Sequence, residues 1–511
     1  MENSRTRNVL KNVSWTTLLQ IILMLLQFVV RTVFIRRLGR DYLGITGLFT
    51  DIMWILDLAN LRIPEAIILS MYKPLAEDNK PKVLALMYLL RKTFLIISVT
   101  ILTLGLMTLP LLKFIIKDPP NIPENFSVLF LFYLFEIVAI YAIIYKRNII
   151  YADQKNYILS IYRNVAHFIQ IIIQIIVLLK VRNFYVFVSI QVIVTLIMNF
   201  MLSAKADRMY PFIKEKSTYK LNTEEISEIK VNIKSMFIYG LGSVSLIGVD
   251  SILVSSIVGI GILGLCSNYM LVINSVKALI DQSMIGFTAS IGNLNVKKDP
   301  EASETTFNQV NFIVFMVTSF FAVNLAASLN TLISIWLGES YMIAQAVVIS
   351  LVLRFYIQST QYATFTFRST LGLLKKKRFI PLYTAAVNIV SSIIMGRFFG
   401  VAGIFFASSI AIFFFTILPE ALLLYKDIFG KSSITFFIRY FGYIIFMAGN
   451  YFITGKIIDQ LPYTGWTNFF LRAILGALIS FSIFILVFFR DKNFRALCSR
   501  LLYIIKDRNK N

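Results

Sequence analysis

The sequence has few charged side chains and almost no histidine or cysteine. Charged residues make up 15% of its 511 residues, whereas a soluble domain has about a quarter. Its one histidine is His167 and its two cysteines are Cys266 and Cys498, so no disulfide framework or His/Cys metal motif is evident. Phosphate-binding loops and Ser-His-Asp sets are not evident either. One histidine and no extramembrane domain leave little room for acid–base catalysis, which needs positioned titratable groups.

Long apolar runs occupy most of the chain instead. Hydrophobic residues make up 57% of it, and the mean hydropathy is +0.74. Runs of about 20 apolar residues recur, and each is long enough to cross a bilayer as a helix. We therefore predict an all-α polytopic membrane protein with about fourteen transmembrane helices. The predicted spans are 13–34, 43–71, 83–112, 127–145, 157–179, 184–204, 235–257, 262–291, 307–329, 341–367, 380–396, 402–424, 436–454 and 468–489.

The net charge of +23 is distributed unevenly between the two sides of the predicted membrane. Of the 50 Lys and Arg residues, 32 fall in inner loops and tails and 9 in outer loops when the N-terminus is placed inside. This bias is typical of the positive-inside rule and predicts that both termini are cytoplasmic. Nucleic acid is not an expected partner, because the longest inner loop, 206–234, leaves no room for a basic soluble domain.

A short repeat divides the chain into two similar halves. The pattern G-x-x-x-L-G-[IL] occurs at 39–45 and again at 259–265, between the first and second helix of each predicted six-helix half. Six spans separate the two copies, so the halves have the same orientation. Parallel repeats of this kind occur in several transporter folds.

Polar and charged residues recur at helical spacing on one face of several spans. Examples are Ser14, Thr17, Gln20, Gln27 and Arg31 on the first span and Ser160, Arg163, His167, Gln170 and Gln174 on the fifth. An intramembrane charge costs about 3 kcal/mol by insertion scales and needs a partner or a wet cavity. One reading of the stripes is hydrogen bonding between helices; the other is a hydrated cavity between the two halves. We predict the cavity, with cations that suit an anionic ligand.

The leading candidates for binding that ligand are Arg31, Lys277 and Arg354, followed by Arg62 and Arg163. Other residues are expected to line the cavity or to couple transport to an ion. They are Gln20, Gln27, Asp51, Asp57, Glu65, His167, Asp250, Asn274, Asp281 and Gln358.

Several of these residues have structural alternatives. Lys277 and Asp281 are four residues apart and can neutralise each other, and Arg62 and Glu65 are three apart. Asp250 is interpreted either as half of a gating ion pair or as the site of a coupling ion, H⁺ or Na⁺. No other cofactor is implied.

Seven segments together resemble the polysaccharide-repeat-unit (Wzx-type) flippases of the MATE-like (MOP) transporter superfamily. They are NVSWTTLLQ at 12–20, LGRDYLGITGLF at 38–49, SMYKPLA at 70–76, YADQK at 151–155, DSILVS at 250–255, SNY at 267–269 and SIGN at 290–293. The chain departs from the family at 61–65, where LRIPE replaces the usual small residues of the second span.

The resemblance implies two six-helix bundles with alternating access, at residues 1–205 and 235–424, joined by a cytoplasmic linker at 206–234. Two appended transmembrane helices at 425–489 and a basic amphipathic cytoplasmic tail at 490–511 would follow. It also implies a monomer in the bacterial cytoplasmic (inner) membrane that flips undecaprenyl-diphosphate-linked oligosaccharides outward for capsule, O-antigen or exopolysaccharide synthesis. Membrane lipids and other polysaccharide-assembly membrane proteins are the further expected partners.

Two alternatives stay open at this point. A cation-coupled multidrug exporter of the same superfamily would be expected to have a more acidic or apolar pocket. An integral-membrane polymerase or acyltransferase of the same pathway would be expected to have a large outer loop or a catalytic histidine.

Overall fold

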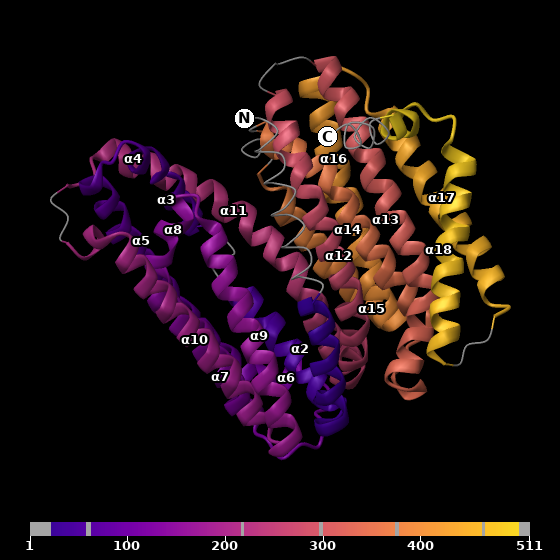
Figure 1. Ribbon diagram of the computed structural model, residues 1–511, viewed down its shortest axis with the longest axis horizontal. Coiled ribbons are helices and arrows are strands. Elements are labelled where there is room, and N and C mark those ends of the chain that lie inside the picture. Colours follow the sequence, from indigo (N-terminus) through magenta and orange to yellow (C-terminus); the bar gives the residue numbers. More distant parts are fainter. Residues whose placement is uncertain are drawn as a thin grey trace, which may run out of the picture. The chain divides into compact units, whose positions relative to one another are not determined.

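The computed structural model describes residues 22–57, 63–215, 219–295, 300–371, 373, 378–461 and 465–499. All regular elements in these ranges are helices, which confirms the all-α fold class. The chain divides into two compact units, Met1–Gly264 and Leu265–Asn511. Figure 1 shows the helices of each unit running roughly along a common direction.

The first unit begins with a helix at 22–38. Its further helices are α2 (Asp41–Leu56), α3 (Ile63–Leu69), α4 (Tyr72–Ala76), α5 (Lys80–Thr108), η2 (Leu109–Leu111), α6 (Leu112–Ile115), α7 (Phe126–Ile143), η3 (Ile144–Arg147), α8 (Asn148–Ala152), α9 (Asn156–Lys180), α10 (Phe184–Met209), η4 (Pro211–Lys214), α11 (Thr223–Leu253) and η5 (Val254–Val258). Within it, α10 packs on α9 and α7, α5 on α7, and α11 on α2 and α3.

The second unit contains most of α12 and everything after it. Its helices are α12 (Ile260–Asn295), α13 (Pro300–Trp336), η6 (Glu339–Tyr341), α14 (Gln345–Thr370), α15 (Ile380–Ile412), η8 (Phe413–Ile417), α16 (Leu418–Leu424), η9 (Tyr425–Phe429), α17 (Ile434–Ile458) and α18 (Trp466–Phe488). A central α13 contacts α14, α17 and α18, and α14 also packs on α15 and α16.

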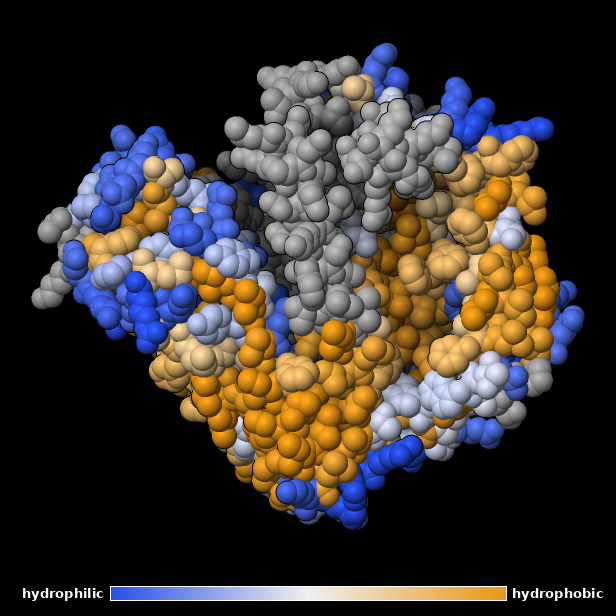
Figure 2. Space-filling view, viewed as in Figure 1, coloured by the Kyte–Doolittle hydropathy of each residue, from blue (hydrophilic) through white to orange (hydrophobic). Residues whose placement is uncertain are grey.

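Large apolar side chains cover the outside of both units. In the described part of the chain, nine helices are long and apolar enough to cross a membrane. Residues such as Phe398, Ile445 and Leu486 are 79%, 72% and 72% exposed, which suits lipid and not water. Figure 2 shows a hydrophobic band over α7, α9 and α10 and hydrophilic residues at the end where α3, α4 and α8 lie. The protein is a multi-pass membrane protein; the number fourteen and the predicted bundle boundaries stay predictions.

Two predicted spans differ from the observed helices for clear backbone reasons. The second span was expected to be continuous over 43–71, but α2 ends at Leu56 and Asp57 leaves the helical conformation at ψ 83°. Pro64 then stands near the start of α3, where its missing N–H costs no hydrogen bond. The tenth span was expected to end at 367, but α14 continues to Thr370 and takes Arg368 from the predicted loop into the helix.

The eleventh and twelfth predicted spans are joined by a tight turn inside α15. Gly400 has φ 60° and ψ −140°, a backbone conformation that disfavours other residues. Beyond it the chain folds back on itself: the hydroxyl of Ser392 donates to the carbonyl of Ile404, and that of Thr384 to the carbonyl of Phe415. This long helix is therefore a hairpin of two antiparallel segments.

The two copies of the sequence repeat lie against each other at the starts of α2 and α12. The first glycine of each copy, Gly39 or Gly259, has a positive φ of 98° or 140°. A Cβ built on Gly44 would lie 2.3 Å from the carbonyl oxygen of Ile260. A Cβ built on Gly264 would lie 2.9 Å from the carbonyl oxygen of Arg40. The repeat thus combines a turn that favours glycine with a close helix crossing that requires it.

Candidate functional site

The polar stripes of the first and fifth predicted spans meet inside the first unit. The side-chain amide of Gln27 donates to the imidazole of His167, with 3.1 Å between the two Nε2 atoms. Arg31 lies one turn from Gln27 on the helix at 22–38, and Arg163 lies one turn from His167 on α9. Because residues four apart share a helix face, this contact places two guanidinium groups along one polar row.

A third arginine extends the row. The guanidinium of Arg147, on η3, donates to the side-chain oxygen of Asn199 at 2.9 Å. Asn199 is 1% exposed and donates in turn to the carbonyl of Thr195 at 2.8 Å. Arg147 and Arg163 are near enough for their positive charges to repel each other, and the Arg163 side chain is exposed. Sequence analysis had counted Arg147 as a loop residue, and no spacing pattern marked it as part of the site.

The far end of the α9 stripe is a structural contact. Gln174 is 4% exposed, and its amide donates to the carbonyl of Phe187 on α10 at 3.2 Å. Gln170 donates to Gln174 at 3.5 Å. Hydrogen bonding between helices therefore accounts for the part of the stripe near Gln174. Arg163 is exposed, and the predicted cavity between the two halves stays a prediction.

Two carboxylates in the first unit accept hydrogen bonds from neutral groups. Asp57, at the break in the second span, accepts from the hydroxyl of Tyr141. Glu136 on α7 accepts from the amide of Gln191 at 2.9 Å. Sequence analysis missed Glu136, although it is the only acidic residue in the apolar run 127–145 and that isolation was a usable signal.

The remaining predicted residues of the first unit lie on different helices and differ in burial. Asp51 is half-buried on α2, Glu65 is exposed on α3, and Asp250 is fully buried in α11. Gln20 and Arg62 lie outside the described residues.

In the second unit, Lys277 and Asp281 form an ion pair. The Lys277 ammonium lies 2.6 Å from the Asp281 carboxylate, with the two side chains 29% and 51% exposed. The alternative that these residues neutralise each other is thus realised, and any role in substrate binding stays a prediction. Asn274, one turn before Lys277, is exposed.

Arg354 lies inside the second unit. Its side chain is buried, with 9% of the residue exposed, and its guanidinium carbon lies 5.4 Å from the centre of the Phe405 ring. That distance suits a cation–π contact between α14 and α15. Gln358, one turn away, is half-buried.

A buried ion pair of the second unit was missed by sequence analysis. Arg368 on α14 and Glu420 on α16 are 0% and 1% exposed and 2.8 Å apart, and the hydroxyl of Thr364 also donates to Glu420. Glu420 is the only charged residue in the run 402–424, so an intramembrane partner was to be expected. Arg368 could not be recognised as that partner, because it followed the predicted end of its span.

Side chains of α9 and α10 line an apolar groove. Its volume is about 430 Å³. It is lined by Ile161, Tyr162, Val165, Ala166, Ile169, Ile173, Ile193, Val194, Ile197, Met198 and Met201. Among the described residues, no group of three or more His, Cys, Asp and Glu side chains is placed to hold a metal ion.

Comparison with solved structures relates this fold to known transporters. No sequence profile of a known family and no curated protein matches the chain. A lipid II flippase, MurJ, in an inward closed conformation is similar with a TM-score of 0.67 and 13% identity, over 92% of this chain and 98% of that one.

Two multidrug transporters are also similar. A MATE family transporter of the MOP superfamily, in an inward-facing conformation, gives a TM-score of 0.59 and 12% identity over 79% of this chain and 94% of that one. A mutant of the Vibrio cholerae MATE transporter VcmN gives 0.56 and 14% over 84% and 98%. The chain therefore has the polytopic helical fold that MurJ shares with the MATE transporters.

Proposed function

We propose that this protein is a transporter that flips lipid-linked oligosaccharides, of the undecaprenyl-diphosphate class, across the bacterial cytoplasmic membrane. The observation that carries the proposal is the contact between Gln27 and His167, which joins the polar stripes of two helices into one row with Arg31 and Arg163. The similarity of the fold to a lipid II flippase supports the same class of substrate.

The chemistry of the row suits a diphosphate. A guanidinium presents paired N–H donors that match two phosphate oxygens, and its charge persists at any physiological pH. Arg147 is held by the neutral amide of Asn199, so its charge is oriented without being cancelled. Sugars and phosphates cannot cross hydrocarbon alone, because each unpaired polar group costs several kcal/mol there.

The groove between α9 and α10 suits the other end of such a substrate. It is apolar, and Ala166 in its lining lies one turn from Arg163 on the same helix. A polyprenyl chain can lie there while its head group contacts the arginines. With the cell interior negative, outward movement of each negative charge gains about 2.3 kcal/mol per 100 mV.

A multidrug exporter is the second candidate, since MATE transporters share the fold. Glu136 favours it, because a buried carboxylate that accepts from a neutral amide can attract a cationic drug or take up a coupling proton. Asp250 stays a candidate for binding a coupling ion.

Transport by the purified protein in proteoliposomes tests the proposal. We expect outward movement of an undecaprenyl-diphosphate oligosaccharide, and a loss of about tenfold or more in Arg163→Ala and Arg31→Ala, since one charge-assisted phosphate contact contributes about 1.5–3 kcal/mol. Lys180→Ala is the matched control, because Lys180 is an exposed cation at the far end of α9.

Lys277→Ala and Arg354→Ala belong in the same series. Losses there would extend the binding residues to the second unit, whereas wild-type rates would make these two cations structural. Export of cationic dyes without movement of any lipid-linked sugar would reject the flippase in favour of the drug exporter.

A further inference from the structure

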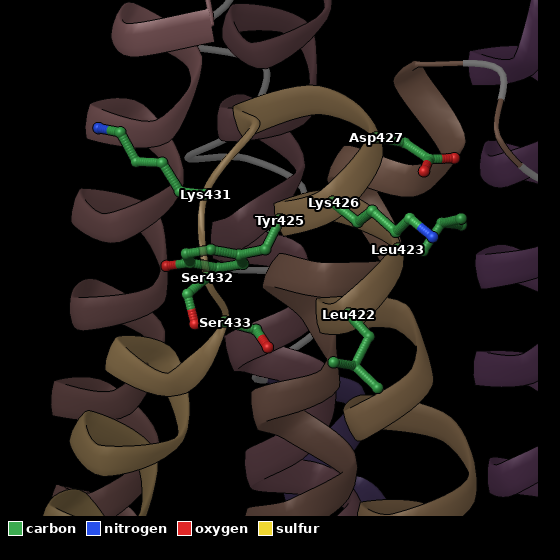
Figure 3. Close-up of a pocket in the computed structure, with 8 residues that line it drawn as sticks. All are labelled: Leu422, Leu423, Tyr425, Lys426, Asp427, Lys431, Ser432 and Ser433. Atoms are coloured by element: carbon green, nitrogen blue, oxygen red, sulfur yellow. The ribbon is translucent and has the colours of Figure 1, made fainter.

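A mixed polar and apolar cavity lies where η9 turns into α17, at one end of the second unit. Its volume is about 710 Å³. Figure 3 shows the chain reversing around it, with Leu422, Leu423 and Lys426 on one limb and Ser432 and Ser433 on the other. The reversal is made at Gly430, which has φ 62°.

The cavity has one cation that is available for a ligand. Lys426 is exposed, and within the described residues it has neither a hydrogen bond nor an ion pair. Lys431, which also lines the cavity, is already held by Glu304 at 2.6 Å. In Figure 3 the Lys426 ammonium ends beside Leu423, on the opposite side of the turn from Lys431.

Two hydroxyl groups face the same space. Ser432 accepts from the Ile434 N–H at 3.3 Å, which leaves its own proton to donate. Ser433 precedes α17 and makes no side-chain cap. The cavity lining thus contains an ammonium on one limb and two hydroxyl groups on the other, together with the carboxylate of Asp427.

Below this polar end runs a strip of exposed apolar side chains. On α17, Ile434, Ile438 and Phe441 are 64%, 67% and 47% exposed at helical spacing, and Leu422 on α16 is 39% exposed. The ring of Phe441 meets that of Phe413 edge-on at 5.4 Å, so the strip bridges α17 and η8. A lysine next to lipid-facing apolar side chains can pack its stem against them while its ammonium reaches the polar membrane interface.

We propose that this cavity binds the phosphate of an anionic phospholipid, whose acyl chain lies along the apolar strip on α17. Lys426 supplies the charge. The positive-inside distribution of the sequence assigns this end to the cytoplasmic leaflet, where anionic lipids attract nearby lysines with about 1 kcal/mol each. A free phosphate ion shares the headgroup chemistry, but it would leave the apolar strip unused.

Lipid binding to the full-length protein in detergent tests this site. Phosphatidylglycerol with a fluorescent acyl chain is titrated into wild type, with phosphatidylcholine and glycerol phosphate as the comparison probes. We expect phosphatidylglycerol to bind several-fold more tightly than phosphatidylcholine and Lys426→Ala to lose about fivefold of that affinity. Lys456→Ala, an exposed cation at the other end of α17, is the matched control and should bind as wild type does.

A second variant addresses the acyl chain. Ile438→Ser should weaken both lipids alike, because it alters the strip and not the phosphate site. Melting temperatures without added lipid show whether each variant folds, and Lys426→Gln replaces Lys426→Ala if the latter does not. Equal affinity of wild type for the two lipids, or equal losses in Lys426→Ala and Lys456→Ala, would overturn the proposal. Competition by glycerol phosphate as effective as that by the lipid would overturn the lipid as the ligand.

Discussion

In the second unit the buried guanidinium of Arg368 lies 2.8 Å from a carboxylate, whereas in the first unit that of Arg147 is bonded to an amide. Lys277 in the second unit is likewise paired with Asp281. Arg163 in the first unit is exposed beside Arg147, a second positive charge. Lys146, the neighbour of Arg147, is paired with Asp207 at 2.7 Å, so the contrast concerns Arg147 and Arg163 on one side and Arg368 and Lys277 on the other.

This difference separates charges that hold the fold from charges that can act on a ligand. A cation paired with a carboxylate in low dielectric is neutralised, and its remaining field on a ligand is small. A cation held by an amide keeps its full charge in a fixed position. Arg147 and Arg163 are therefore the better candidates for binding an anion.

The largest effect is expected from removing the buried carboxylate of the second unit. Glu420→Leu leaves Arg368 buried without its counter-charge, which should lower the free energy of unfolding by about 3–5 kcal/mol. Thermal denaturation of the protein in detergent measures this loss. The double variant Arg368→Met with Glu420→Leu should regain most of the stability, because it buries no charge.

Asp281→Ala serves as the matched control for that experiment. It removes a carboxylate from the same unit, but from a partly exposed helical pair that contributes only about 0.3–0.5 kcal/mol. Equal melting temperatures for Glu420→Leu and Asp281→Ala would show that burial does not distinguish the two pairs.

The next largest effect is expected from placing a carboxylate beside Arg147, as Glu420 lies beside Arg368 in the second unit. Asn199→Asp places a carboxylate against Arg147 at a position that is 1% exposed. The new ion pair should hold the fold but cancel the charge of Arg147, so we expect transport of the lipid-linked sugar to fall about tenfold while the melting temperature is kept or raised. Transport rates in proteoliposomes and melting in detergent are measured on the same preparation.

A charge-neutral substitution at the same position is the control. Asn199→Ala removes the hydrogen bond without adding an anion, so it should reduce stability more than transport. If Asn199→Asp transports as fast as wild type, the charge of Arg147 does not act on the substrate.

Much of this fold could be predicted from apolar length and the positions of glycine. The hairpin in α15 falls between the predicted spans 380–396 and 402–424, because Gly400 and the charge of Arg397 interrupt the apolar run. The repeated glycines of the motif at 39–45 and 259–265 also had a physical reason, a positive φ followed by a close helix crossing. Patterns of this kind are local, so a single sequence reveals them.

Pairing between helices could not be predicted in the same way. Arg368 and Glu420 are far apart in sequence, and hydropathy placed Arg368 in a loop. The break at Asp57 was also missed, because the residues after it are apolar enough to continue a span. Periodicity shows which face of a helix is polar, but the packing of other helices decides whether that face meets a carboxylate, an amide or a ligand.

A smaller effect is expected at the contact that joins the two polar stripes of the first unit. Gln27→Leu removes its hydrogen bond to His167, and interhelical hydrogen bonds in membranes average about 0.6 kcal/mol. We therefore expect a small decrease in melting temperature and a modest decrease in transport. Gln170→Leu, which breaks only the long 3.5 Å contact to Gln174, is the control and should change neither. Abolished transport at an unchanged melting temperature would instead assign Gln27 to the substrate path.

The smallest effect on stability is expected at the ion pair between Lys82 and Glu225 of the first unit, which lies outside the predicted membrane spans. The Lys82 ammonium lies 2.5 Å from Glu225, which also accepts from the backbone N–H of Asn222; these contacts lower the pKa of Glu225 below its ordinary 4.5. A lowered carboxyl pKa stabilises the fold above the ordinary value, and that stability is lost as the pH falls through the lowered pKa. The melting temperatures of wild type and Glu225→Gln should thus differ slightly at pH 7, by less than about 1 kcal/mol of stability, and converge in acid. A difference that grows as the pH falls would mean that Lys82 and Glu225 are not paired in the folded protein.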